Sequence, residues 1–115
     1  MKDKLKKFFS ILLVEFTDLE DELQMLIDST EERFKRHEIT GYVWTENTAL
    51  LKRELTLIRL IHKKIAELDP VDYSNIEEAK RAVLETVNNQ HSVPQAVPQF
   101  IEKRLEKVVR YLEEC

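Results

Sequence analysis

Glycine is nearly absent from this chain, which has one glycine among 115 residues. Proteins contain about 7% glycine on average, so a chain of this length would ordinarily carry about eight. Sandwich and barrel folds require many tight turns, and phosphate-binding loops require several glycines close together. The scarcity of glycine therefore disfavours all-β folds and glycine-rich nucleotide sites, and it favours a helical protein.

Length, charge and cysteine content narrow the possibilities further. With 43% hydrophobic and 35% charged residues, the chain has the composition of one soluble domain spanning residues 1–115. The net charge of −4 comes from an acidic excess in residues 1–50, and no face is evidently basic, so no nucleic-acid partner is expected. The single cysteine, Cys115, can form no internal disulfide, which points to a reducing, cytoplasmic location.

Apolar residues recur at helical spacing along almost the whole chain. The first helix carries an unbroken heptad seam, formed by Leu5, Phe9, Leu12, Phe16, Leu19, Leu23 and Leu26. The complete pattern predicts four helices, over residues 3–38, 45–68, 75–89 and 98–114. The first two are the longest and would form a hairpin, with the two shorter helices packed alongside. The expected fold is therefore all-α: an antiparallel four-helix bundle built on a long helical hairpin.

Capping and breaking residues set the expected helix boundaries. Gly41 suits the left-handed residue that often ends a helix, and Thr45 suits the N-cap of the next one. Pro98 is expected as the first residue of the fourth helix, where its missing N–H carries no cost. A break in the first helix near Asp28 is an alternative, because the following four residues resemble a capping box, although we expect the helix to continue.

The first half of the first helix is apolar on every side, which is unusual for a bundle helix. Between Phe8 and Phe16 the apolar side chains leave no wide polar face, and the second helix is apolar over about two thirds of its circumference. A helix in a four-helix bundle normally keeps one face in water, so this pattern predicts an interface with a partner. The residues expected at that interface are Phe8, Phe9, Leu12, Leu13 and Phe16, joined by Leu57 and Leu60.

Three kinds of partner could cover such a surface. A second copy of the chain is the first expectation, since most soluble oligomers are two-fold homodimers. A helix of another protein could instead lie in a groove of the bundle. A membrane surface is the least favoured, because anionic lipid would repel the acidic stretch that begins at Asp18. The expected function is thus a non-enzymatic helical interaction or regulatory module that forms a homodimer or binds a partner helix.

His62 suggests an alternative function, because it lies within the apolar arc of the second helix. A single helix histidine in a small bundle is similar to the phosphoacceptor of histidine phosphotransfer signalling domains. In those domains the histidine begins a His-x-x-Lys-Gly pattern. Here Ile65 stands at the lysine position and Ala66 at the glycine position, so the pattern is not matched. The simpler interpretation is a histidine at the edge of the core, hydrogen-bonded to a neighbour.

Two carboxylates within apolar arcs, Glu15 and Glu54, are the remaining candidates for chemistry. Together with His62 they define a possible polar site, which would be a small-molecule or enzymatic site at a seam between subunits. The simpler interpretation gives each carboxylate a basic partner such as Arg53 or Arg59. No histidine or cysteine has a spacing typical of a metal ligand, and no serine has the sequence context of a catalytic nucleophile. No metal, cofactor or catalytic residue is therefore expected.

Overall fold

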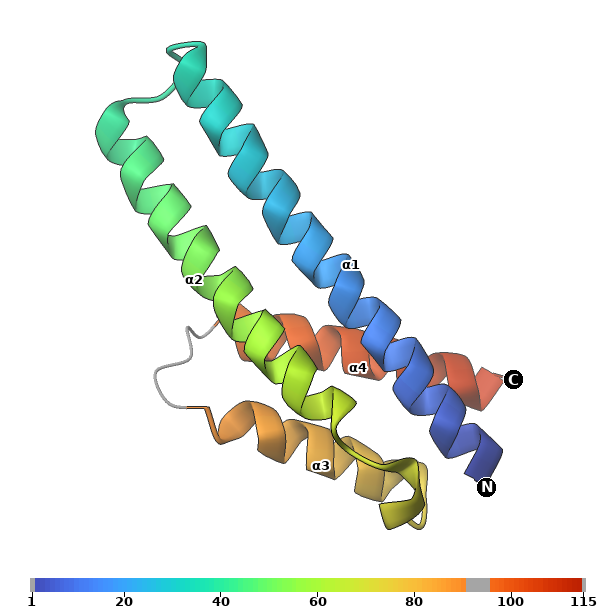
Figure 1. Cartoon of the computed structure of the whole chain (residues 1–115). Coiled ribbons are helices and arrows are strands. Elements are labelled where there is room, and N and C mark those ends of the chain that lie inside the picture. The colour runs from blue at the N-terminus through green and yellow to red at the C-terminus, as the bar shows by residue number, and fades with distance from the viewer. Residues whose placement is uncertain (1, 91–95, 115) are drawn as a thin grey trace.

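The computed structural model describes residues 2–90 and 96–114, which form helices joined by short connections. The elements are α1 (Lys2–Lys35), α2 (Gly41–Ala66), the short 3-10 helix η1 (Pro70–Asp72), α3 (Ile76–Asn88) and α4 (Ala96–Glu114), as Figure 1 shows. The described part of the chain contains no strand, so the predicted all-α class is confirmed. His91, Pro94 and Cys115 lie outside the described residues.

α1 and α2 form a long hairpin, and α3 and α4 lie at one end of it. In Figure 1 the turn between α1 and α2 is far from the N-terminus, whereas α3 and α4 lie near the N-terminus and are inclined to the hairpin. The ring of Phe16 lies 5.5 Å from that of His62, and the ring of Phe34 lies 4.6 Å from that of Trp44. Residue numbers therefore fall along α2 as they rise along the adjoining α1.

The N-terminal half of α1 lies at the centre of the core. It is here that α1 meets the other elements, and α1 contacts α2, η1, α3 and α4. The buried side chains of α1 are Leu5, Phe8, Phe9, Leu12, Glu15, Phe16, Leu19, Leu23 and Ile27. Because other helices pack around this segment, the chain itself buries most of its apolar side chains, whereas Val14 remains 59% exposed. Phe8, Phe9, Leu12 and Phe16, which the sequence places at an interface with a partner, are thus covered within the chain.

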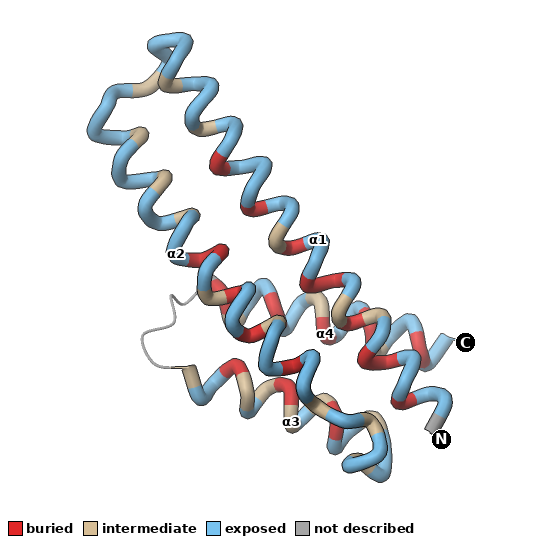
Figure 2. The backbone as a smooth tube through the Cα atoms, viewed as in Figure 1, coloured by how far each residue is buried: buried red, intermediate tan, exposed pale blue. Residues whose placement is uncertain are grey.

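Beyond this core the hairpin continues as two helices alone, a segment that we call the distal arm (residues 28–53). No residue of the distal arm is buried, in contrast to Ile27 and Glu54 at its base. Figure 2 shows this change along the hairpin, because its buried positions lie toward the end that carries α3 and α4. The stacked rings of Phe34 and Trp44 join the two helices near the tip.

α1 runs unbroken through Asp28, as predicted, and ends in a Schellman motif at His37. His37 has a φ of 61°, and the N–H of Glu38 donates to the carbonyl of Arg33 at 2.9 Å. Gly41, which was predicted for the left-handed position, is instead the first residue of α2, and its φ is not positive. The prediction was wrong because histidine is among the residues that tolerate the left-handed region, so the turn closes before the glycine is reached.

Two predicted helix starts are also wrong by a few residues. Thr40, rather than Thr45, is the N-cap of α2, and its Oγ1 accepts a hydrogen bond from the N–H of Val43 at 3.2 Å. α4 begins at Ala96, so Pro98 falls inside the first turn instead of at its first position. Proline is tolerated there because N–H groups of the first turn have no acceptor within the helix.

The heptad seam departs from the prediction at its last position. Ile27 is only 7% exposed, whereas Leu26, the predicted seam residue, is 52% exposed. A straight α-helix drifts by about 20° in every heptad relative to an exact 3.5-residue repeat. Over the three heptads that begin at Leu5, this drift amounts to about 60°. It therefore leaves Leu26 exposed and Ile27 buried.

Thr40→Ala should lower the free energy of unfolding by about 1 kcal/mol, because it removes the side-chain acceptor of the Val43 N–H. Thr45→Ala, in the interior of α2, is the matched control and should leave stability unchanged or raise it slightly. Urea denaturation followed by circular dichroism measures both. Equal losses in the two variants would contradict the assignment of Thr40 as the cap.

Candidate functional site

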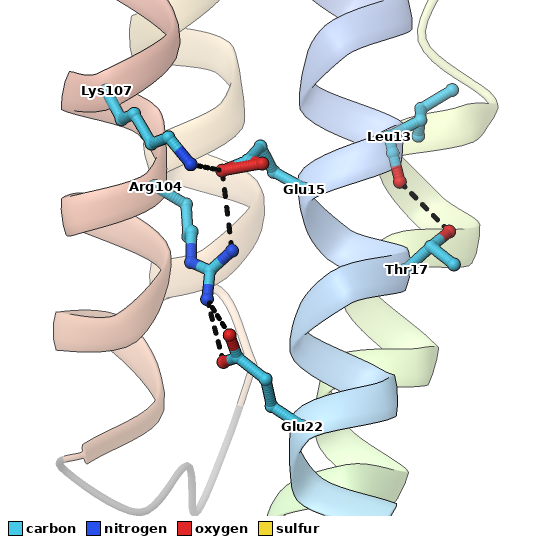
Figure 3. A network of polar contacts seen from close by, with 6 residues as sticks. All are labelled: Leu13, Glu15, Thr17, Glu22, Arg104 and Lys107. Carbon is cyan, nitrogen blue, oxygen red and sulfur yellow. Dashed lines mark hydrogen bonds and ion pairs between the residues drawn. The ribbon is translucent and has the colours of Figure 1, made fainter.

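A network of charged side chains joins α1 to α4, as Figure 3 shows. Lys107 Nζ lies 3.0 Å from Glu15 Oε1, and Arg104 Nη1 lies 3.4 Å from the same oxygen. Arg104 Nη2 donates to both carboxylate oxygens of Glu22, each at 2.7 Å. Glu15 is buried and Glu22 is exposed, so the guanidinium connects a carboxylate at the edge of the core to one at the surface.

Helical spacing explains how this network arises. Glu15 and Glu22 are seven residues apart on α1, and Arg104 and Lys107 are three apart on α4, so each pair shares one face of its helix. Burial by itself would lower the pKa of Arg104, but hydrogen bonds and charges from Glu22 and Glu15 outweigh it and hold that pKa above its ordinary value. The guanidinium therefore stays charged in the folded chain, and the arrangement acts as a clamp between two helices.

His62 lies in the seam between α1 and α2, where its partner is Glu20. The Nδ1 atom of His62 is 3.1 Å from Glu20 Oε2, and Arg59 Nε is 4.0 Å from Glu20 Oε1. The side chain of His62 is 24% exposed and its ring packs beside Phe16, so the histidine is at the edge of the core. A phosphoryl group on this ring would bring its negative charge toward the carboxylate of Glu20, so these surroundings oppose a phosphoacceptor role.

Glu54 is a second buried carboxylate, placed on α2 at the base of the distal arm. Burial raises its pKa above the ordinary value of 4.5, because removal from water disfavours the charged form. Both carboxylates that the sequence placed within apolar arcs, Glu15 and Glu54, are thus buried. Their surroundings differ, because cationic side chains of α4 approach Glu15, whereas desolvation dominates at Glu54.

Glu15 and His62, two of the three residues of the predicted polar site, have different partners in the structure. Glu15 faces α4, whereas His62 faces Glu20 across the α1–α2 seam. Glu15 lines a cavity of about 210 Å³, whose other walls are Ile11, Lys107, Val108 and Tyr111. This cavity includes neither of the other two residues, so the expected seam site has no common pocket there. Within residues 2–90 and 96–114, no three His, Cys, Asp or Glu side chains are grouped to hold a metal ion.

The residues predicted for an interface do not form one exposed surface. Phe8, Phe9, Leu12 and Phe16 are buried in the core of the chain itself, Leu13 and Leu57 are partly buried, and Leu60 is exposed. The large apolar side chains that are exposed on α1 and α2 are Val14, Met25, Leu26, Tyr42, Val43, Leu50 and Leu60. Most of these lie on the distal arm or at its base, a region that the sequence reasoning did not single out because polar residues interrupt its pattern.

The sequence reasoning also missed the partners of Glu15. The partners expected from the sequence were Arg53 or Arg59 of the second helix, whereas the structure places Arg104 and Lys107 of α4 beside this carboxylate. A signal was available, because acidic residues seven apart on one helix and basic residues three apart on another present matching charged faces. That signal does not say which helices are neighbours, so it could not be used without the tertiary structure.

Arg104→Ala should lower the free energy of unfolding by roughly 1–3 kcal/mol, since it leaves the buried Glu15 with one of its two cationic partners. Arg36→Ala is the control, because it breaks an exposed pair with Glu32 and should cost less than about 0.5 kcal/mol. Chemical denaturation at pH 7 gives both values. A loss at Arg104 no larger than the loss at Arg36 would show that the clamp adds no stability.

Glu54→Gln should stabilise the folded chain at pH 7, because it removes a buried charge and keeps nearly the same shape. The pKa of Glu54 is raised in the folded state, so its ionisation costs stability above that pKa and costs nothing below the ordinary value of 4.5. The gap in unfolding free energy between the variant and the wild type should therefore close as the pH falls toward 4.5. Urea titrations at several pH values measure it, and a gap that is independent of pH would refute this account.

No protein family model, curated protein or solved structure matches the chain. Among the described helices, none is both long enough and apolar enough to cross a membrane.

Proposed function

We propose that the chain is a non-enzymatic helical interaction module, which holds another helical segment against its distal arm. The observation that carries this proposal is the arm itself, in which two helices project from the core without a single buried residue. Two helices alone bury little apolar surface, and most of the stability of a helix in a protein comes from packing. An arm of this kind gains stability when a further helix packs on it.

One face of the arm is suited to this contact. Leu26 follows Glu22 by four residues, so it continues the face of α1 that meets α4 closer to the N-terminus. Leu50 precedes the buried Glu54 by four residues, and Val43 lies seven residues further back, so both continue the face of α2 that enters the core. Leu26, Val43 and Leu50 are exposed, and we call these three residues the open face.

The charged clusters support a structural role better than a chemical one. Glu15 with Arg104 joins α1 to α4, and Glu20 with His62 joins α1 to α2. Each ionisable group is thereby engaged in holding two helices together. Neither the phosphotransfer alternative at His62 nor the seam site with Glu54 gains support from this arrangement, and the interaction module remains the function that the geometry favours.

We also propose that the helices form an antiparallel bundle and that the protein is cytoplasmic. Lys7 lies 5.6 Å from the ring centre of Tyr111, and Arg104 meets Glu22, so residue numbers fall along α4 as they rise along α1. These pairs support an antiparallel four-helix bundle at the N-terminal end of the hairpin. The single cysteine of the chain, Cys115, supports a reducing location such as the cytoplasm.

Photo-crosslinking in the native cells tests this function. A photo-reactive amino acid in place of the exposed Asn47, between Val43 and Leu50 on α2, should form crosslinks to a helical protein or to another copy of the chain. Adding Leu26→Asp should reduce these products by about tenfold or more, since a charge on an apolar contact costs at least about 1.4 kcal/mol. The control places the same reagent at the exposed Lys103 of α4. Equal crosslinking at the two positions, or crosslinks at position 47 that survive Leu26→Asp, would contradict the proposal.

A further inference from the structure

We infer that the open face is covered by a second copy of this chain, so that the distal arms of two copies pack against each other. This inference rests on the proposed function and names the occupant of the same surface. Three features support it: the charge of the arm, the extra layer that α3 and α4 form beside the hairpin, and the size of the open face.

The distribution of charge favours a second copy. Residues 28–53 carry five acidic and five basic side chains, so the arm is neutral and the net charge of −4 lies outside it. Two arms can therefore meet without net repulsion, whereas contact between two cores would bring like charges together. Within the arm, opposite charges pair with each other, as in Lys35 with Glu31 and Arg36 with Glu32. The arm thus presents no strong field that would select a highly charged partner.

The step at the end of α3 and α4 determines how two copies meet. These helices add a layer of one helix diameter, about 10 Å, to the face of the hairpin that the open face continues. If two arms pointed in the same direction, two such layers would face each other and hold the arms apart. If the arms point in opposite directions, each can lie beside the α3–α4 layer of the other copy. The result is a two-fold symmetric arrangement in which the two arms form a layer of four helices.

The size of the open face indicates that this dimer is weak. Within the distal arm α1 extends over residues 28–35 and α2 over residues 41–53, and two adjacent helices are roughly 20 Å wide. A face of this kind buries roughly 400 Å² on each copy, which is about half the area of a standard stable interface. We therefore expect a dimer that forms and dissociates with concentration in the micromolar to millimolar range. Because the arm is neutral, this association should respond little to salt.

Sedimentation velocity of the purified full chain tests the inference, with no other protein present. The sedimentation coefficient should rise from the monomer value toward the dimer value as concentration increases, at both low and high salt. Leu26→Asp and Leu50→Asp should each weaken the dimer by about tenfold or more. Val14→Asp, the same kind of change at an exposed apolar position of α1 outside the open face, should leave the dimer unchanged. Circular dichroism confirms folding, and Leu50→Ser provides a milder variant with the same expected direction.

Several outcomes would overturn the inference. One is a chain that stays monomeric at every concentration. Another is a dimer that is weakened by Val14→Asp or Leu60→Asp but not by changes on the open face, since that would place the interface on the core. A monomeric chain whose crosslinks at position 47 in cells still depend on Leu26 would reject the second copy and leave the proposed interaction function standing. Crosslinks that ignore the open face would instead reject that function.

Discussion

Burial of the N-terminal half of α1 is the constraint on which the rest of the structure depends. A helix that is apolar on every side is stable only when other elements surround it. α2, η1, α3 and α4 all contact α1, and Phe8, Leu12 and Phe16 are completely buried as a result. Both short helices therefore pack at one end of the hairpin. The distal arm follows from the same demand, because no helix of the described chain remains to cover the other end.

Ion pairs at the edge of this core restrict how the helices are oriented on one another. Arg104 and Lys107 approach the buried Glu15 from α4, and Glu20 approaches His62 across the α1–α2 seam. Apolar contacts are not directional, whereas a guanidinium that is hydrogen-bonded to two carboxylates restricts how α4 lies on α1. Glu15 and His62, which the sequence made candidates for chemistry, therefore form ion pairs or hydrogen bonds that join two helices.

The proposed interaction surface arises where the core stops. At the base of the arm Leu26 of the heptad seam points outward, and Leu50, four residues before the buried Glu54 on α2, is also exposed. Apolar residues exposed beside a free helix pair are typical of surfaces that bind another helix. The neutral charge of the arm then favours a copy of the same chain over a strongly basic or acidic partner.

The sequence by itself determined the all-α class and the approximate extent of the helices, and it placed Glu15 and Glu54 within apolar arcs. It favoured a continuous α1 through Asp28 but left a break there open. These features follow from helical periodicity and local propensity, which are written in neighbouring residues. Only the tertiary structure decided that the chain itself covers Phe8 and Phe16, that α4 supplies the partners of Glu15, and that His37 rather than the glycine closes the hairpin turn. Periodicity shows which face of a helix is apolar, but it does not show which helix packs on that face, because the same stripe fits any complementary neighbour.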